Sequence, residues 1–131
     1  AKVLYNCALN PLSALLDVPY GELLATEGTR DIMAEVVHEG YAVAEAMAAP
    51  MKPETPDAYV RLLFETLIPP TAAHYASMRE DLRLGHRTEI GALNGALMDY
   101  GAGYGVPCPT NALLTRLVRA REFAARHRQG V

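Results

Sequence analysis

The sequence predicts an all-α protein that folds as one domain. Apolar residues recur at spacings of three and four along nearly every segment, no segment alternates as a strand does, and prolines or glycines separate the segments. The chain has 131 residues, of which 50% are hydrophobic and 21% are charged, so it can bury one compact core. We expect a single domain of six to seven helices over residues 1–131, without internal repeats.

Helical periodicity and helix-breaking residues place the elements in order. The predicted helices cover residues 2–15, 20–25, 29–48, 56–68, 71–78, 88–100 and 111–127. The charged segment 79–87 is expected to be irregular. In the last helix, the side chains expected to face the core are Leu113, Leu114, Leu117, Val118 and Phe123. The basic stretch from Arg116 to Arg128, which Glu122 interrupts, is expected to form the solvated face of that helix.

A glycine-rich segment, Gly101–Gly105, resembles the loops that bind phosphate groups. Such a loop follows a strand and opens a helix, whereas this segment follows a predicted helix and leads into Pro107 and Pro109. Glycine tolerates the positive φ found at a helix C-terminus, so we interpret the segment as a helix end and a turn. The chain therefore has no nucleotide-binding motif of its own.

Composition argues against several classes of function. The formal net charge of −3 and the lack of a basic cluster argue against nucleic-acid binding. No run of 18 apolar residues is present, so a membrane span is not expected, and the first residues do not resemble a signal peptide. Cys7 and Cys108 are interpreted as free thiols of a cytoplasmic protein. The four histidines form no HxxxH or HExxH pair, so no metal site is expected.

Lys2, Asn6 and Asn10 recur every four residues in the first predicted helix. At about 100° per residue they share an arc of roughly 80°, into which Ser13 also falls unless Pro11 redirects the helix. One ammonium and two amides on one face can bind an oxyanion, orient a carbonyl group and donate a proton. The alternative is the ordinary polar face of an amphipathic helix. Asparagine is a poorer helix former than Glu, Lys or Gln, which favours specific partners for these amides.

A second polar stretch runs from Ser77 to Ile90. Ser77 has a hydroxyl at a predicted helix end, and Glu89 is expected in the first turn of a helix that Thr88 caps, where the helix dipole favours a carboxylate. The arginines of this stretch alternate with acidic residues, which is typical of a self-neutralising surface. From the residues alone, helix capping and surface charge explain this stretch as well as a binding site does.

A set of short motifs extends over almost the whole chain. In order, these are Lys2-(x)3-Asn6-(x)3-Asn10-Pro11-Leu12, Gly21-Glu22-Leu23, Glu39, Ser77-Met78-(x)2-Asp81, Arg87-Thr88-Glu89-Ile90, Leu93-Asn94-Gly95 and Pro109-(x)-Asn111. Each motif is weak alone, but together and in this order they resemble the C-terminal domain of the ketopantoate reductases (2-dehydropantoate 2-reductases).

The resemblance implies a fold and a reaction. It predicts that this domain is similar to the C-terminal domain of 6-phosphogluconate dehydrogenase, and that an N-terminal Rossmann domain, absent from residues 1–131, binds NADPH and completes the substrate cleft. In the implied reaction, NADPH delivers a hydride to C2 of ketopantoate, which gives pantoate for pantothenate and coenzyme A synthesis. The isolated domain is expected to be inactive, no metal is involved, and a homodimer is a further expectation.

The resemblance also implies roles for single residues. Lys2 matches the general acid that protonates the developing alkoxide, where negative charge needs a cation or an acid. Asn6 and Asn10 match substrate-binding positions. Ser77 matches the residue that helps to hold the substrate carboxylate, and Glu89 matches a position that contacts the cofactor.

Tyr20 departs from the pattern of those family members that have a substrate-binding asparagine at this position. A tyrosine offers one hydroxyl in place of an amide and is bulkier, so the substrate is either ketopantoate or another branched 2-keto acid. A third interpretation is a non-catalytic helical interaction module that kept the fold and lost the chemistry. The coding sequence upstream of Ala1 distinguishes this module from the enzyme, because only the enzyme requires a nucleotide-binding domain there.

Overall fold

The computed structural model describes the backbone of residues 2–129 and the side chains of residues 3–127. Over that range it contains six α-helices and no strand, which confirms the predicted all-α class, and none of its helices is long and apolar enough to cross a membrane. The α-helices are α1 (Lys2–Leu16), α2 (Glu27–Ala46), α3 (Pro56–Leu62), α4 (Ser77–Leu84), α5 (Asn94–Gly103) and α6 (Pro109–Gln129). The shorter elements are the 3-10 helices η1 (Tyr20–Leu24), η3 (Pro69–Thr71) and η4 (Ile90–Ala92), and the π-helical turn η2 (Leu63–Leu67).

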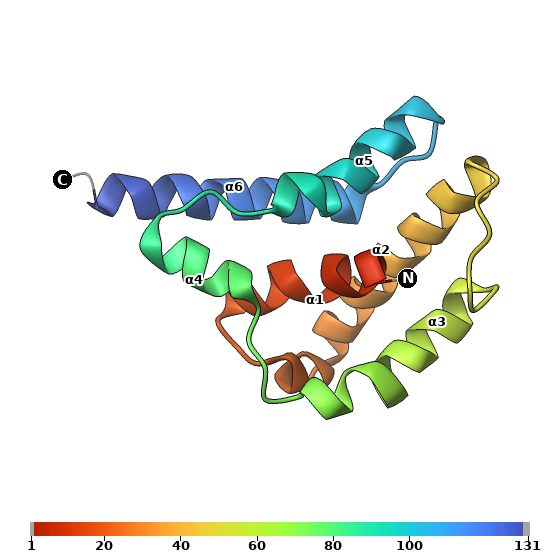
Figure 1. Cartoon of the computed structure of the whole chain (residues 1–131), viewed down its shortest axis with the longest axis horizontal. Coiled ribbons are helices and arrows are strands. Elements are labelled where there is room, and N and C mark those ends of the chain that lie inside the picture. The colour runs from red at the N-terminus through yellow and green to blue at the C-terminus, as the bar shows by residue number, and fades with distance from the viewer. Residues whose placement is uncertain (1, 130–131) are drawn as a thin grey trace.

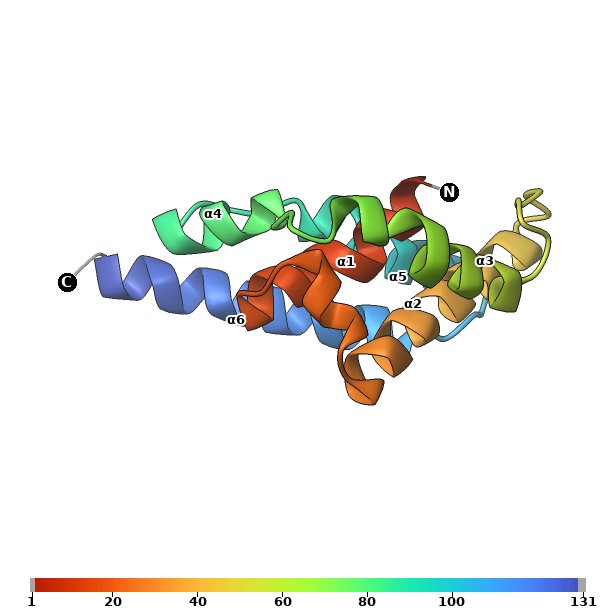
Figure 2. The same ribbon diagram turned by 90° about the horizontal axis from the view of Figure 1, so that it is seen from below.

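Helix α1 lies in the middle of the molecule. It packs against α2, α4 and α6, and Figure 1 shows α5 and α6 along one side of it and α3 along the other. In the view from below, α1 lies between α4 and α6 (Figure 2). Cys7, Ala8 and Leu9 of α1 have no exposed surface. Because α2, α4 and α6 pack against α1, the backbone of this helix is held in place. The polar residues on its face, among them Asn6 and Asn10, therefore have fixed backbone positions.

Threonine caps determine where two helices begin. Thr26 Oγ1 accepts a hydrogen bond from the backbone N–H of Thr29 at 3.4 Å, and Thr55 Oγ1 accepts one from Ala58 at 3.2 Å. Pro56 follows as the first residue of α3, where no N–H is needed. The predicted start at Pro56 is therefore confirmed, whereas α2 begins slightly before the predicted Thr29.

The prediction of a helix over residues 71–78 is wrong. Most of this segment is turn or extended chain, and α4 begins only near its end and continues through residues predicted to be irregular. The backbone N–H of Tyr20 donates to the carbonyl of His74 at 2.9 Å, and that of Ala76 donates to Ser13 Oγ at 3.2 Å. These tertiary hydrogen bonds take the place of the local ones that a helix requires.

The predicted helix over residues 88–100 begins and ends later than expected. The 3-10 helix η4 comes first, and α5 then continues through Gly101 to Gly103. The backbone N–H of Val106 donates to the carbonyl of Gly101 at 2.7 Å, and Gly105 has a φ of 73°. The glycine-rich segment is therefore a helix end and a turn, as predicted, although its first half belongs to the helix.

Helix α6 buries a different face from the predicted one. Leu114 and Val118 are buried as expected. The side chains that are exposed instead of buried are Leu113 (48%), Leu117 (44%) and Phe123 (56%). Glu122 lies on the same face as Leu114 and Val118 and is only 1% exposed, so the expectation that it interrupts a solvated face is wrong. The buried face of α6 therefore includes a carboxylate that needs partners from other elements.

Candidate functional site

Asn6 and Asn10 lie one turn apart on the same face of α1, and both are half-buried. Asn10 Oδ1 accepts a hydrogen bond of 2.7 Å from the hydroxyl of Tyr20 in η1. Within the described part of the chain, Asn10 Nδ2 and the amide of Asn6 have no hydrogen bond. These groups can therefore bind another molecule, and the amide of Asn10 has a defined orientation.

Lys2 is the first residue of α1, but its side chain lies outside the described residues. The backbone places it one helical turn before Asn6, so the expected spacing of Lys2, Asn6 and Asn10 on one helix face holds for their backbone positions. Pro11 does not end α1, which continues through it to Leu16. One continuous helix therefore carries these three predicted site residues.

Ser13 does not belong to this polar face. It is fully buried, and its hydroxyl donates to the carbonyl of Val18 at 2.6 Å and accepts from the backbone N–H of Ala76 at 3.2 Å. These bonds connect the last turns of α1 to the start of α4. Ser77 is the next residue, and it is exposed at the first position of α4, which packs against α1.

The exposed Glu89 follows Thr88, and Thr88 is held by α6. Glu122 Oε2 accepts hydrogen bonds from the backbone N–H of Thr88 at 2.8 Å and from its hydroxyl at 2.6 Å. Arg119 Nη1 donates to both oxygens of Glu122 at 2.9 Å. Burial alone would raise the pKa of the Glu122 carboxyl, but these hydrogen bonds outweigh burial and hold the pKa below its ordinary value. A buried carboxylate thus positions the residue that precedes Glu89.

A second buried network adjoins Asn6 on α1. Asn94 Nδ2, at the start of α5, donates to the backbone carbonyl of Cys7 at 3.0 Å and to Asn111 Oδ1 at 2.9 Å. Glu39 Oε1 of α2 accepts from the backbone N–H of Asn111 at 3.0 Å and from its Nδ2 at 2.8 Å. The carboxylate also lies at the N-terminus of α6, where the helix dipole favours it. These bonds join α1, α2, α5 and α6 and hold α1 in place.

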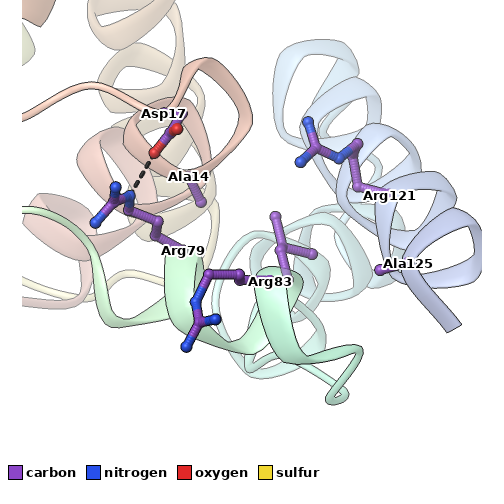
Figure 3. A pocket seen from close by; sticks show the side chains of 7 residues that line it. Ala14, Asp17, Arg79, Arg83, Arg121 and Ala125 are labelled. Carbon is purple, nitrogen blue, oxygen red and sulfur yellow. Dashed lines mark hydrogen bonds and ion pairs between the residues drawn. The ribbon is translucent and has the colours of Figure 1, made fainter. Parts of the chain in front are cut away.

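A pocket of about 320 Å³ lies near the end of α1, between α4 and α6 (Figure 3). Three arginines line it, of which Arg79 forms an ion pair with Asp17 and Arg83 forms one with Glu80. Figure 3 shows the guanidinium groups of Arg83 and Arg121 pointing in different directions. Because these groups do not converge, the pocket does not have the arrangement of an anion-binding site.

An apolar groove of about 540 Å³ lies between the first turn of α1, the second half of α2 and α5. Val3 and Tyr100 line this groove, and each is 57% exposed. Ala92 of η4 lies at the same groove, so the segment after Glu89 approaches the N-terminal end of α1. Exposed apolar surfaces of this kind are typical of contacts between proteins or domains.

The described residues contain no group of three His, Cys, Asp or Glu side chains that could hold a metal ion. In the same range, no strand leads through a glycine-rich turn into a helix, which is the unit that binds the pyrophosphate of dinucleotides. The free thiols of Cys7 and Cys108 are buried, and burial raises the pKa of Cys7 to about 12. The polar groups that the described residues offer to a small molecule therefore include the amides of Asn6 and Asn10.

Comparison with known proteins assigns this arrangement to a family. The sequence pattern described as ketopantoate reductase PanE/ApbA C terminal matches residues 1–122. The chain belongs to the ketopantoate reductase family. It is 46% identical over 122 residues to the 2-dehydropantoate 2-reductase of Aquifex aeolicus, a match that covers 93% of this chain and 39% of that relative. The 2-dehydropantoate 2-reductase of Streptococcus pyogenes serotype M1 is 36% identical, with 92% and 38% covered. The chain thus spans about two fifths of the length of these ketopantoate reductases.

Solved structures with the same helical fold include a ketopantoate reductase and a D-mandelate dehydrogenase. The PanE/ApbA family ketopantoate reductase of Ralstonia eutropha JMP134 matches with a TM-score of 0.84 at 35% identity, over 96% of this chain and 41% of that one. D-mandelate dehydrogenase in complex with NADH matches with a TM-score of 0.81 at 31% identity, over 95% of this chain and 41% of that one. The fold and the family that the motifs predict are therefore confirmed.

The structure also shows contacts that sequence reasoning did not find. The bond between Tyr20 and Asn10 joins two different helical elements, η1 and α1, and no local sequence pattern indicates it. The only sequence signal of Glu122 is a carboxylate within a basic helix. Four predicted site residues have described side chains, namely Asn6, Asn10, Ser77 and Glu89. Within the described residues, no hydrogen bond joins any two of them. Their functional roles stay predictions.

Proposed function

We propose that this chain is the substrate-binding part of an NADPH-dependent 2-dehydropantoate 2-reductase, which reduces ketopantoate to pantoate. The observation that carries the proposal is the 46% identity to the enzyme of that name from Aquifex aeolicus over 93% of the chain. The half-buried amides of Asn6 and Asn10 on one face of α1 support it. Because the chain spans 39% of that relative, the activity belongs to a longer protein.

Each predicted site residue has a role that suits its chemistry. Bound NADPH supplies the hydride. Lys2, one turn before Asn6, protonates the oxygen of the reduced carbonyl group, where negative charge develops. The N–H groups of Asn6 and Asn10 donate to oxygens of the 2-keto acid, and their fixed positions on α1 orient it. The hydroxyl of Ser77 donates to the substrate carboxylate, and Glu89 contacts the cofactor.

We further propose that a Rossmann domain N-terminal to residue 1 holds the NADPH, so that the isolated chain is inactive. The greater length of the relatives supports this proposal. The apolar groove lined by Val3 and Tyr100 supports a contact between the first turn of α1 and another protein surface, either that domain or a second copy in a homodimer. The two buried free thiols agree with a cytoplasmic location.

The second candidate substrate is another branched 2-keto acid. Two observations favour it, namely the 31% identity to D-mandelate dehydrogenase and the tyrosine at position 20. The complex of that relative with NADH makes NADH the alternative cofactor. The third candidate is a non-catalytic helical interaction module, which predicts that Lys2→Ala and Asn6→Ala leave function unchanged.

The test uses the full-length protein that contains this chain. The oxidation of NADPH or NADH is followed with ketopantoate and with a panel of other 2-keto acids. We expect a preference for ketopantoate with NADPH, and we expect Lys2→Ala to lower kcat by about 10²- to 10⁴-fold, because the reaction loses its general acid. The matched control is Lys52→Ala, which removes an exposed lysine from the loop before α3 and is expected to leave kcat unchanged.

Each outcome of this experiment has a defined meaning. A preference for ketopantoate together with a specific effect of Lys2→Ala supports the proposal. A preference for a different 2-keto acid keeps the role of Lys2 and changes the substrate. If no 2-keto acid is reduced, or if Lys2→Ala and Lys52→Ala behave alike, the catalytic proposal is overturned and the interaction module is favoured.

A further inference from the structure

Tyr20 is held in position by contacts on several sides. It is 8% exposed, and its ring lies edge-on to that of Tyr5, with centroids 6.2 Å apart and planes at 90°. The hydroxyl of Tyr5 is in turn hydrogen bonded to Thr71 Oγ1 at 3.0 Å. The backbone N–H of Tyr20 donates to the carbonyl of His74 at 2.9 Å. The Tyr20 hydroxyl therefore has a fixed place, supported by both α1 and the segment before α4.

The residue after Tyr20 strengthens this attachment. The backbone N–H of Gly21 donates to the carbonyl of Ala72 at 2.9 Å. A Cβ atom on Gly21 would lie 2.8 Å from the Cβ of Ala72, closer than real Cβ contacts allow. Two backbone segments thus meet closely enough that glycine is required, and they hold Tyr20 between them and α1.

In the structure, the Asn10 amide turns its oxygen toward the hydroxyl of Tyr20. A half-turn of an asparagine side chain exchanges its acceptor Oδ1 and its donor Nδ2. Here Tyr20 donates to Oδ1 at 2.7 Å. Burial, together with the neighbouring Tyr5, raises the pKa of the Tyr20 hydroxyl, so it keeps its proton near neutral pH. Asn10 Nδ2 is left without a hydrogen bond within the described part of the chain.

We propose that Tyr20 is a positioning residue that fixes the amide of Asn10 as a donor toward the substrate. This inference rests on the proposed function, because it specifies how Asn10 binds a 2-keto acid. An amide held in this way binds an acceptor oxygen, such as the carboxylate or carbonyl oxygen of a 2-keto acid, and disfavours a donor group at the same place. Tyr20 acts through Asn10 and need not contact the substrate.

The test compares Tyr20→Phe with Tyr41→Phe in the full-length protein. Tyr41 is a matched control, because it is 7% exposed and its hydroxyl donates to the carbonyl of Pro53 at 2.6 Å, in a different part of the domain. We expect Tyr20→Phe to raise KM for the preferred 2-keto acid about fivefold to tenfold, the change that one hydrogen bond produces, with a much smaller effect on kcat. We expect Tyr41→Phe to leave KM unchanged although it also loses a buried hydrogen bond.

A double-mutant cycle with Asn10→Ala tests whether the effect passes through Asn10. If it does, Tyr20→Phe raises KM in the wild-type background and has no further effect on KM in the Asn10→Ala protein. If the wild type is active but Tyr20→Phe changes KM no more than Tyr41→Phe does, this inference alone is overturned. The same holds if Tyr20→Phe raises KM equally in the wild-type and the Asn10→Ala backgrounds. A wild type that reduces no 2-keto acid overturns the proposed function, and this inference with it.

Discussion

The carboxylate of Glu122 in α6 accepts two hydrogen bonds from Thr88, which lies 34 residues earlier in the chain. One bond comes from the backbone and the other from the hydroxyl, so both the main chain and the side chain of Thr88 are held. Arg119 shares the same carboxylate and balances its charge. Because Glu89 directly follows Thr88, this buried group positions the segment that the family resemblance assigns to cofactor contact.

Glu122→Gln should destabilise the protein. The substitution removes a buried charge that accepts from Thr88 and leaves Arg119 without its ionic partner, so we expect the free energy of unfolding to fall by about 1–3 kcal/mol near neutral pH. Urea unfolding followed by circular dichroism measures this change. Glu54→Gln is the control, because Glu54 is exposed in the loop before α3 and should change stability by less than about 0.5 kcal/mol. Equal effects of the two substitutions would contradict the prediction.

The contribution of Glu122 should depend on pH. Since hydrogen bonds lower the pKa of this carboxyl in the folded state, the unfolded state binds the proton more tightly. The stabilisation is fully present above the unfolded pKa of about 4.3 and is lost as the pH falls through the lower folded value. The stability difference between the wild type and Glu122→Gln should therefore shrink as the pH falls from about 6 to about 3. Unfolding curves at several pH values measure it, and a difference independent of pH would disprove this assignment.

Two glycines of α5 should respond oppositely to alanine. A Cβ on Gly101 would lie 2.6 Å from the carbonyl oxygen of Val106 and 2.8 Å from Sγ of Cys108, whereas a Cβ on Gly103 would meet nothing within 4 Å. Gly103→Ala should raise the Tm, because alanine is favoured over glycine in a helix, by up to about 1 kcal/mol in the interior and by less at the last residue of α5. Gly101→Ala should lower the Tm, since relieving the overlap requires a shift of the backbone and costs about 1–3 kcal/mol. Thermal unfolding of both variants provides the measurement, and shifts of the same sign would argue against the packing described at Gly101.

Local signals account for most of the helices. Prolines, threonine caps and apolar spacing act within a few residues, and α1, α2, α3 and α6 accordingly begin within two residues of their predicted starts. The segment before α4 was predicted wrongly because its hydrogen bonds go to Ser13 and Tyr20, which lie more than fifty residues away in the chain. The start of α5 was misplaced for a related reason: Thr88 Oγ1 accepts from the backbone N–H of Ile90 at 3.3 Å, at the start of the short η4, while Thr88 also bonds to Glu122 of α6, and α5 begins only afterwards.

By itself, the sequence determined the helical class, most helix starts and the family whose motifs it contains. Only the tertiary structure decided that Glu122 is buried, that Ser13 leaves the polar face of α1, and that the Tyr20 hydroxyl is bonded to Asn10. Periodicity shows which side of a helix is apolar. Whether a carboxylate, hydroxyl or amide can lie inside depends on donors and acceptors that other elements bring to it, because an unpaired buried polar group costs several kcal/mol. The hydrogen-bond partners of these buried groups include residues from other parts of the chain, so no local pattern predicts them all and only the folded structure shows them.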